Sequence, residues 1–231
     1  MKAQVLLPKI FNYPFTYNSK IEVKLGDLVV VPFGSKKEIG IIWKNKFKEP
    51  KNLKIKEIES KTGFSIDRKL IDFIEWFSSY NMVPLGLVLK MVIGGSDKFI
   101  KIKDNIIEIK KYKKKKFKLN NEQLNAVRFL KKVENKFDVS VLLGTTGSGK
   151  TLVYFERIKK IIEKNNQALV LLPEIYLTND FKSRFIEFFG FEPAIWHSKK
   201  TPKQKRIIWN GIIDNKVKIL IGARSALLLP F

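Results

Sequence analysis

The residues with the clearest chemical signature form a glycine-rich run that reads Gly-Thr-Thr-Gly-Ser-Gly-Lys-Thr. The run fits the pattern G-x-x-x-x-G-K-[ST], in which glycines let backbone N–H groups turn inward around phosphate oxygens. Lys150 is expected to neutralise the β- and γ-phosphates of a nucleoside triphosphate, and Thr151 to hold the Mg²⁺ ion that bridges them. The predicted nucleotide-binding residues are Gly144, Thr145, Thr146, Gly147, Ser148, Gly149, Lys150 and Thr151, the last two with catalytic roles.

Two flanking elements must hold this loop in place. The apolar stretch from Val139 to Leu143 predicts a strand before it, and a helix is predicted after Thr151. The helix N-terminus would add a favourable dipole potential for phosphate. An ordinary glycine-rich turn is the competing interpretation, but residue types, spacing and flanks together favour nucleotide binding.

The chain from Leu119 onward alternates strands with helices, which is typical of an α/β layer with parallel strands. Further strands are expected at Ala168 to Leu172 and Val217 to Ile221. Thr201 and Gln204 fit a capping box, so another helix should begin there.

Gln123 lies upstream of the glycine-rich run and allows two interpretations. Its amide could read both the donor and the acceptor of adenine. Alternatively, Asn120 and Gln123 mark the start of a helix, in which Gln123 only caps its own backbone. The spacing alone does not decide between them.

Small and polar residues follow two predicted strands, where an open α/β sheet forms its ligand crevice. Pro173 and Thr178 come after the first of these strands, and Arg224 and Ser225 come after the second. Arg224 and the small residues around it could hold a nucleic-acid phosphate, with Thr178 adding a hydroxyl contact. Taken singly, each could equally belong to a loop or a helix cap.

The N-terminal part has a different character, because short apolar runs alternate with proline and glycine up to about Lys61. The runs Val5 to Leu7, Leu28 to Val31 and Ile39 to Trp43 predict β-strands. Such closely spaced strands suggest a small barrel or sandwich. One helix should follow, because apolar residues recur at helical spacing at Ile66, Leu70, Phe73, Ile74 and Phe77.

A lysine-rich stretch separates the two modules. It ends in Lys110-Lys111-Tyr112-Lys113-Lys114-Lys115-Lys116-Phe117-Lys118, which is too self-repelling to pack into a core. We prefer a solvated linker over a dedicated DNA-binding tail as its interpretation. The predicted domains are residues 1–98 and 119–231, with the linker at 99–118.

The composition restricts the class of protein. Lys and Arg number 45 against 22 Asp and Glu, and the net charge of +23 favours nucleic acid as a partner, although a lysine-rich proteome would give the same excess. With no cysteine and one histidine, the chain cannot build a disulfide or a structural zinc site. It has neither an apolar run of about 18 residues nor a signal peptide, so we expect a soluble, cytoplasmic protein without a membrane partner.

Together these motifs resemble the PriA family of bacterial replication-restart DNA helicases. The resemblance covers almost the whole chain, which corresponds to the N-terminal part of the proteins in that family. The motifs that carry the resemblance are, in family order, Leu7-Pro8, Phe15-Thr16-Tyr17, Val31-Pro32-Phe33-Gly34, Gly40-Ile41-Ile42, Pro84-Leu85-Gly86 after a helix with Trp76 and Tyr80, Gly144 to Thr151, Pro173-Glu174-Ile175 with Leu177-Thr178, His197-Ser198, and Gly222 to Leu227 with Pro230-Phe231.

The resemblance implies that residues 1–98 are a 3′-end DNA-binding domain that recognises the leading-strand end at a fork. Its pocket would contain Phe15, Thr16, Tyr17, Gly34 and Lys54. An aromatic ring there can stack on a terminal base, and a glycine allows close backbone approach. Thr16 stands where the family has an acidic residue, which should weaken recognition of a 3′-hydroxyl. Packing within a strand is the competing interpretation for Phe15 and Tyr17.

The resemblance also implies the fold class, an incomplete α/β RecA-like P-loop NTPase lobe preceded by a small β-rich, barrel-like DNA-binding domain. Gln123 would be the adenine-reading glutamine, and Pro173, Thr178, Arg224 and Ser225 would contact DNA. The lysine-rich stretch stands in place of the family's winged-helix domain. The acidic Mg²⁺ motif, the second motor lobe and the zinc-binding cysteines would lie beyond Phe231.

The implied function is that of an ATP-dependent 3′-to-5′ DNA helicase in replication restart at stalled forks, with ATP and Mg²⁺ as cofactors. Its implied partners are forked and single-stranded DNA with 3′ ends, primosome proteins and single-strand-binding proteins. The chain alone should bind ATP but scarcely hydrolyse it. Two alternatives remain: a stand-alone fork- or end-binding module with a vestigial nucleotide site, and an unrelated P-loop kinase or ATPase, which would not predict the N-terminal module.

Overall fold

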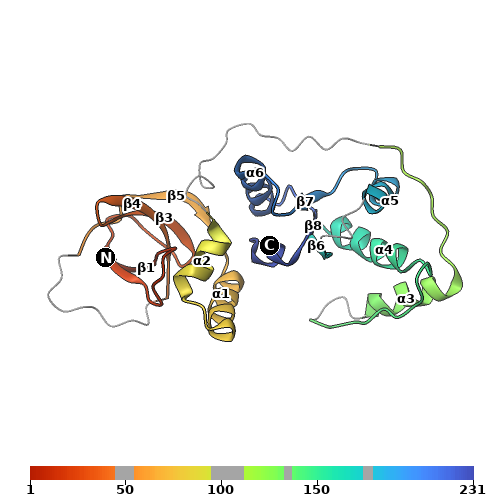
Figure 1. Ribbon diagram of the computed structural model, residues 1–231, viewed down its shortest axis with the longest axis horizontal. Helices are drawn as coiled ribbons and strands as arrows, with labels where there is room; N and C mark the ends of the chain where they lie inside the picture. Colours follow the sequence, from red (N-terminus) through yellow and green to blue (C-terminus); the bar gives the residue numbers. More distant parts are fainter. Residues whose placement is uncertain (45–54, 95–111, 133–136, 174–178) are drawn as a thin grey trace. The chain divides into compact units, whose positions relative to one another are not determined.

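The computed structural model describes residues 1–44, 55–94, 112–132, 137–173 and 179–231. The chain forms two compact units, one mainly from the N-terminal strands and helices and the other mainly from residues beyond 112 (Figure 1). Among the described helices, none combines the length and the apolar character needed to cross a membrane.

The first unit is an antiparallel sheet of five strands, in the order β2-β1-β4-β3-β5, with two helices. Its elements are β1 Lys2–Leu6, β2 Phe15–Asn18, β3 Asp27–Phe33, β4 Lys36–Ile42, β5 Ser60–Ser65, α1 Arg68–Asn81 and α2 Leu85–Ile93. The three predicted strand runs correspond to β1, β3 and β4, although β1 and β4 each end one residue earlier than predicted, and the predicted helix is α1. The strands β2 and β5 and the second helix, α2, were not predicted.

The two edges of this sheet meet. Asn18, at the end of β2, donates its backbone N–H to Lys56 O over 2.8 Å, and its carbonyl accepts from the Ile58 N–H over 2.8 Å. Lys56 and Ile58 directly precede β5, so the sheet curves towards the small barrel that the sequence suggested. The inner face carries an apolar core of Ala3, Val5, Leu7, Tyr17, Val29, Val31, Ile42 and Ile58.

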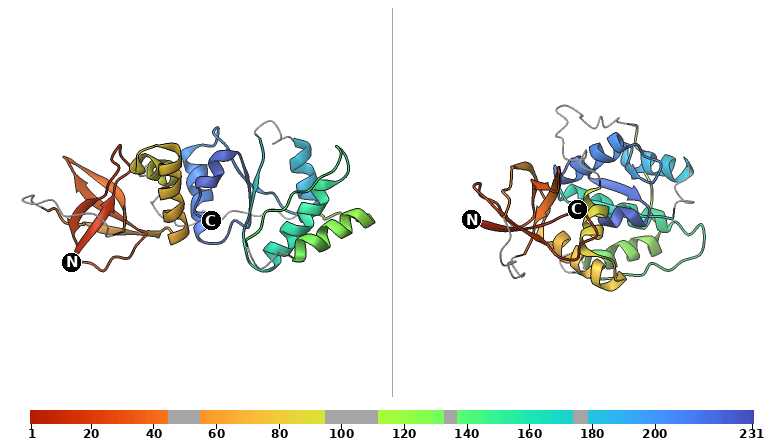
Figure 2. Two further views of the ribbon diagram at one scale, coloured as in Figure 1. Left: turned by 90° about the horizontal axis from the view of Figure 1, so that it is seen from below. Right: turned by 60° about the vertical axis from the view of Figure 1, so that its left-hand side comes forward.

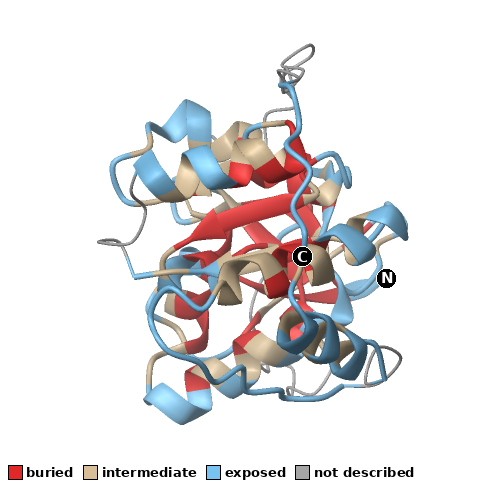
Figure 3. Cartoon of the chain, turned by 90° about the vertical axis from the view of Figure 1, so that its right-hand side faces the viewer, coloured by how far each residue is buried: buried red, intermediate tan, exposed pale blue. Residues whose placement is uncertain are grey.

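The second unit contains a parallel sheet of three strands in the order β6-β8-β7. Its elements are α3 Asn121–Lys132, α4 Lys150–Glu163, β6 Ala168–Leu171, α5 Asn179–Phe189, β7 Ala194–Trp196, β8 Ile219–Gly222 and the short 3₁₀ helix η3 Arg224–Leu228. Helix α6 Pro202–Ile213 belongs to the first unit up to Asn210. Helix α3 lies beside α4 (Figure 2). The central strand β8 is buried along its length, its neighbours β6 and β7 are partly buried, and the helices expose their outer faces (Figure 3).

Helices α4 and α5 share one apolar core with β6 and β8. Phe155 of α4 is buried, and its ring lies 5.6 Å from that of Phe185 and 5.3 Å from that of Phe188, both on α5. Full burial of a large apolar side chain contributes about 1.5–3 kcal/mol. These contacts hold α5 against α4 and so place polar residues of α5 near the first turns of α4.

One strand prediction is wrong within the described residues. Val139 to Leu143 forms no strand, and its side chains are open to solvent, with Val139 76% and Leu143 86% exposed. An apolar run becomes a strand only when it pairs with a neighbour and buries a face, and this run pairs with no described strand. The other two strands are present, although β8 begins two residues later than expected, at Ile219.

The described part of the lysine-rich stretch lies alongside the C-terminal end of α5. The backbone N–H of Tyr112 donates to Gly190 O over 2.7 Å, and that of Lys115 donates to Glu187 O over 2.8 Å. The lysine side chains themselves are exposed. The side chains of this stretch are therefore solvated, as expected, but its backbone is hydrogen-bonded to the end of α5. The charge of the residues alone did not predict this contact.

Candidate nucleotide-binding site

The glycine-rich run lies directly before α4, as the sequence predicted. Gly149 is the N-cap of this helix, with φ 78° and ψ 23°, in the left-handed region that favours glycine. The Ser148 N–H donates to Thr145 O over 3.3 Å and closes the turn. Because the first N–H groups of a helix have no intrahelical acceptor, the loop and the helix start together offer donors to an anion.

The Lys150 ammonium lies among the carbonyl groups of this loop. Its Nζ donates to Gly144 O over 2.6 Å and to Thr145 O over 2.7 Å. A phosphate would compete with these two oxygens for the ammonium, because an ammonium attracts a phosphate anion more strongly than it attracts a neutral carbonyl group.

The Thr151 hydroxyl, the predicted Mg²⁺ ligand, accepts a hydrogen bond from the Tyr154 hydroxyl over 3.3 Å. Burial raises the pKa of Tyr154, so this phenol stays neutral and able to donate. A hydroxyl oxygen has two lone pairs, so one remains on Thr151 for a cation.

Gln123 makes contacts that fit both interpretations of its role. Its Oε1 accepts from the Asn120 N–H over 3.0 Å, and Asn120 Oδ1 accepts from the Gln123 N–H over 2.8 Å, so the helix cap is confirmed. Its Nε2 donates to Ser148 O over 3.0 Å and ties α3 to the loop. A side-chain amide has two donors and two lone pairs, so one of each remains for an adenine edge.

A cavity of about 750 Å³ lies against the loop and the first turn of α4. The run contributes five of the predicted residues to its wall: Thr146, Gly147, Gly149, Lys150 and Thr151. Gly144, Thr145 and Ser148 instead accept or donate the hydrogen bonds that shape the loop. The structure therefore brings the predicted phosphate ligands together around one space.

The predicted DNA contacts of this unit gather at the carboxyl ends of β6 and β8. The strands run parallel with Leu171 opposite Gly222, so both end at the same edge of the sheet. A cavity of about 650 Å³ lies there, lined by Leu171, Leu172, Pro173, Ala223, Arg224 and Ser225. Pro173, Arg224 and Ser225 are thus brought together, whereas Thr178 lies outside the described residues.

Tyr17 in the first unit is packed in the core. Its side chain is 4% exposed, its hydroxyl donates to Pro32 O over 3.2 Å, and burial raises its pKa to about 12. The ring is therefore not available for stacking on a base, in line with the packing interpretation. Phe15 packs against the same core but is only partly buried.

Phe15 belongs to an aromatic cluster that sequence reasoning missed. Its ring lies 4.9 Å from Phe11, 5.3 Å from Tyr13 and 5.3 Å from Phe33, and Tyr13 is 48% exposed. The period-two spacing of Phe11, Tyr13 and Phe15 was the available signal. Gly34, with φ 60°, directly follows Phe33, so it lies at the edge of this cluster.

Of the remaining members of the predicted end pocket, Thr16 does not share this face. Thr16 pairs across the sheet with Gln4, and its Oγ1 accepts from Gln4 Nε2 over 3.1 Å. Lys54 lies outside the described residues, but Lys56 donates from Nζ to Gly34 O over 3.2 Å and places a cation beside the glycine.

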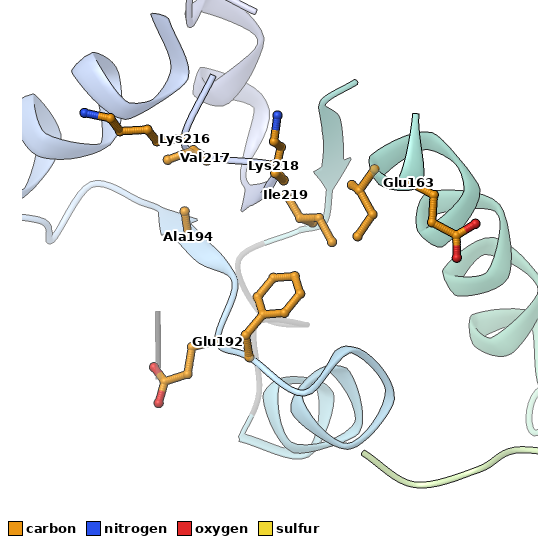
Figure 4. Close-up of a pocket in the computed structure, with 9 residues that line it drawn as sticks. Glu163, Glu192, Ala194, Lys216, Val217, Lys218 and Ile219 are labelled. Carbon is orange, nitrogen blue, oxygen red and sulfur yellow. The ribbon is translucent and has the colours of Figure 1, made fainter. Parts of the chain in front are cut away.

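A third cavity, of about 330 Å³, lies at the amino ends of β7 and β8. Its interior is apolar, and the charged ends of Glu163, Glu192, Lys216 and Lys218 point outward (Figure 4). Each of these groups has a partner close by, for example Lys182 at 3.0 Å from Glu192 and Asn165 Oδ1 at 2.6 Å from Lys218. This cavity is therefore a gap in the apolar packing, and none of the polar groups that line it points into it as a ligand-binding group would.

Comparison with known proteins matches two parts of the chain to two families. Residues 4–94 match the PriA 3′DNA-binding domain, and residues 116–229 match the res subunit of type III restriction enzymes. The chain is 42% identical over 99% of its length to the replication restart protein PriA of Rickettsia prowazekii, and 30% identical over 94% to that of Helicobacter pylori J99. It covers 35% and 33% of these proteins, so it spans about a third of their length.

Proposed function

Because the chain corresponds to the N-terminal part of the PriA family, we propose that it binds ATP with Mg²⁺ in its second unit and DNA through both units. The observation that carries the proposal is the cavity in which Lys150, Thr151 and the loop glycines meet at the start of α4. The second unit would be the first RecA-like lobe of a 3′-to-5′ helicase acting in replication restart, together with primosome and single-strand-binding proteins.

Nucleotide binding requires a small rearrangement of the loop. The Lys150 ammonium would exchange its two carbonyl partners for phosphate oxygens. The free lone pair of the Thr151 hydroxyl would hold Mg²⁺, which neutralises phosphate charge when bound. The remaining donor and acceptor of the Gln123 amide would read adenine, while its other two bonds keep α3 and the loop in register.

DNA binding in the second unit would use the edge where β6 and β8 end. Arg224 is exposed there, beside Ser225 and Pro173, and an arginine on a phosphate positions a strand without reading its sequence. In the first unit, the aromatic cluster around Phe15 and the cation of Lys56 at Gly34 would receive a 3′ end.

Lys150→Ala tests the nucleotide site. Loss of charge-assisted bonds to phosphate should weaken binding of a fluorescent ATP analogue about 10- to 150-fold. Lys160→Ala is a matched control, because that lysine is exposed on the same helix and pairs with Glu163. Unchanged affinity for Lys150→Ala would overturn the assignment, and DNA binding without any nucleotide binding would favour the stand-alone module.

DNA contacts are tested in about 150 mM salt, because a chain of net charge +23 binds any DNA at low ionic strength. Arg224→Ala should weaken single-strand binding and lower the slope of log affinity against log salt by about 0.7, the value for one phosphate contact. Equal affinity of the chain for 3′-hydroxyl and 3′-phosphate ends would refute specific end recognition.

A further inference from the structure

The nucleotide cavity has a wall that the glycine-rich pattern does not explain. Besides the loop and the first turns of α4, it is lined by Phe117 from the lysine-rich stretch and by Arg184 and Glu187 from α5. Neither segment is near the loop in sequence. These segments place an aromatic ring and a cation beside a phosphate-binding loop. A ring can stack on the base of a nucleotide, and a cation can pair with its phosphates.

The ring of Phe117 is held in place on one side. It stacks on Phe188 of α5 with a centroid distance of 5.7 Å and an interplanar angle of 26°, yet it remains 38% exposed. The backbone bond from Lys115 to Glu187, two residues earlier, fixes the direction of the chain. A ring stacked on one face and exposed to the cavity is a ready platform for a base.

Arg184 supplies an available positive charge. It is exposed and makes no ion pair with the residues that the structure describes. It lines the same cavity as Lys150 and Thr151, so its charge shares one space with the predicted phosphate and metal ligands. Glu187, the carboxylate of this wall, is paired with Lys115, so it does not cancel the charge of Arg184.

We propose that Phe117 stacks on the base and Arg184 pairs with the polyphosphate of the nucleotide held by the glycine-rich loop. Arg184 and Phe188 are four residues apart on α5 and therefore lie on one face, which aligns the cation and the stacked ring along the same wall. This assignment rests on the proposed function, and it predicts that the site prefers an intact nucleoside triphosphate to inorganic tripolyphosphate.

The test is a competition of ATP and of inorganic tripolyphosphate against a fluorescent ATP analogue bound to the full chain. Base–aromatic stacking is worth about 5- to 150-fold in affinity, so Phe117→Ala should weaken ATP binding by that factor and leave tripolyphosphate binding unchanged. Phe117→Trp should retain ATP binding. Arg184→Ala should weaken both ligands by about tenfold or more. Phe129→Ala is the matched control, because this ring on α3 is 58% exposed and does not line the cavity.

Unchanged ATP affinity in Phe117→Ala would overturn base stacking, and an equal loss for both ligands would show that the ring only supports α5. Unchanged tripolyphosphate affinity in Arg184→Ala would overturn the phosphate role. These outcomes differ from failure of the proposed function itself, which would appear as a wild-type chain that binds neither ligand or as a Lys150→Ala variant without effect, and which would overturn this assignment too.

Discussion

Gly149→Ala should weaken nucleotide binding by about 10- to 300-fold. An alanine in the left-handed region costs roughly 1–2 kcal/mol, and the φ of 78° at Gly149 lies in that region. The new Cβ would also meet Gln123 Nε2 at 2.3 Å, so the amide must move and lose its bond to Ser148, worth about 0.5–1.5 kcal/mol net. The two costs add up to about 1.5–3.5 kcal/mol. If the nucleotide binds only the original loop conformation, each 1.4 kcal/mol of this cost lowers the affinity tenfold.

The assay is titration of the full chain with a fluorescent ATP analogue, with Gly147→Ala as the matched control. Gly147 has φ 84° but open space around a new Cβ, so only the backbone term of about 5- to 30-fold should appear. In a Gln123→Ala background the amide is absent, and Gly149→Ala should likewise cost only that term. An equal cost of Gly149→Ala in both backgrounds would refute the reasoning that the glycine makes room for Gln123.

Two further predictions concern the first unit. Asp67 Oδ1 accepts from the Leu70 N–H over 2.8 Å at the start of α1. Asp67→Ala should therefore lower the free energy of unfolding by about 0.5–2 kcal/mol in urea titrations, whereas Asp67→Asn should keep most of the stability of the wild type. Equal losses in the two variants would contradict the cap. The pKa of Tyr17 is raised to about 12, so its stabilisation is complete below the unfolded value near 10 and is lost as the pH rises towards 12. Tyr17→Phe should flatten that loss of stability between pH 9 and 12, and an unchanged pH profile would exclude Tyr17 as its cause.

The features that the sequence predicted well depend on neighbours within a few residues. The glycine-rich loop before α4 is one, and the Thr201–Gln204 capping box is another, because both of its reciprocal hydrogen bonds are present at 3.1 and 3.3 Å. Three of the five strands of the first unit, β1, β3 and β4, were also predicted, because short apolar runs there alternate with turn residues.

The features that the sequence did not predict depend on which distant segment lies alongside. Val139 to Leu143 has the composition of a strand, but composition does not supply the partner that makes a strand. Tyr17 has the residue type of a stacking group, yet the register that places it opposite Ala3 turns it into the core. Phe117 and Arg184 could not be assigned to the nucleotide cavity without knowing that α5 packs on α4.

Gln123 shows how local and distant determinants combine in the candidate site. Its cap on Asn120 is local and sets where α3 begins, which in turn fixes the position of the side-chain amide. The same amide then reaches Ser148, which is 25 residues away in sequence, and holds the loop that Lys150 also draws inward through two carbonyl groups. If Lys150 turns to a phosphate, those two carbonyl bonds are given up, and the bond from Gln123 remains to keep the loop in shape. The glutamine would then act on nucleotide affinity through the loop as well as through the base, so Gln123→Ala should weaken tripolyphosphate binding in addition to ATP binding, whereas a residue that only reads adenine would affect ATP alone.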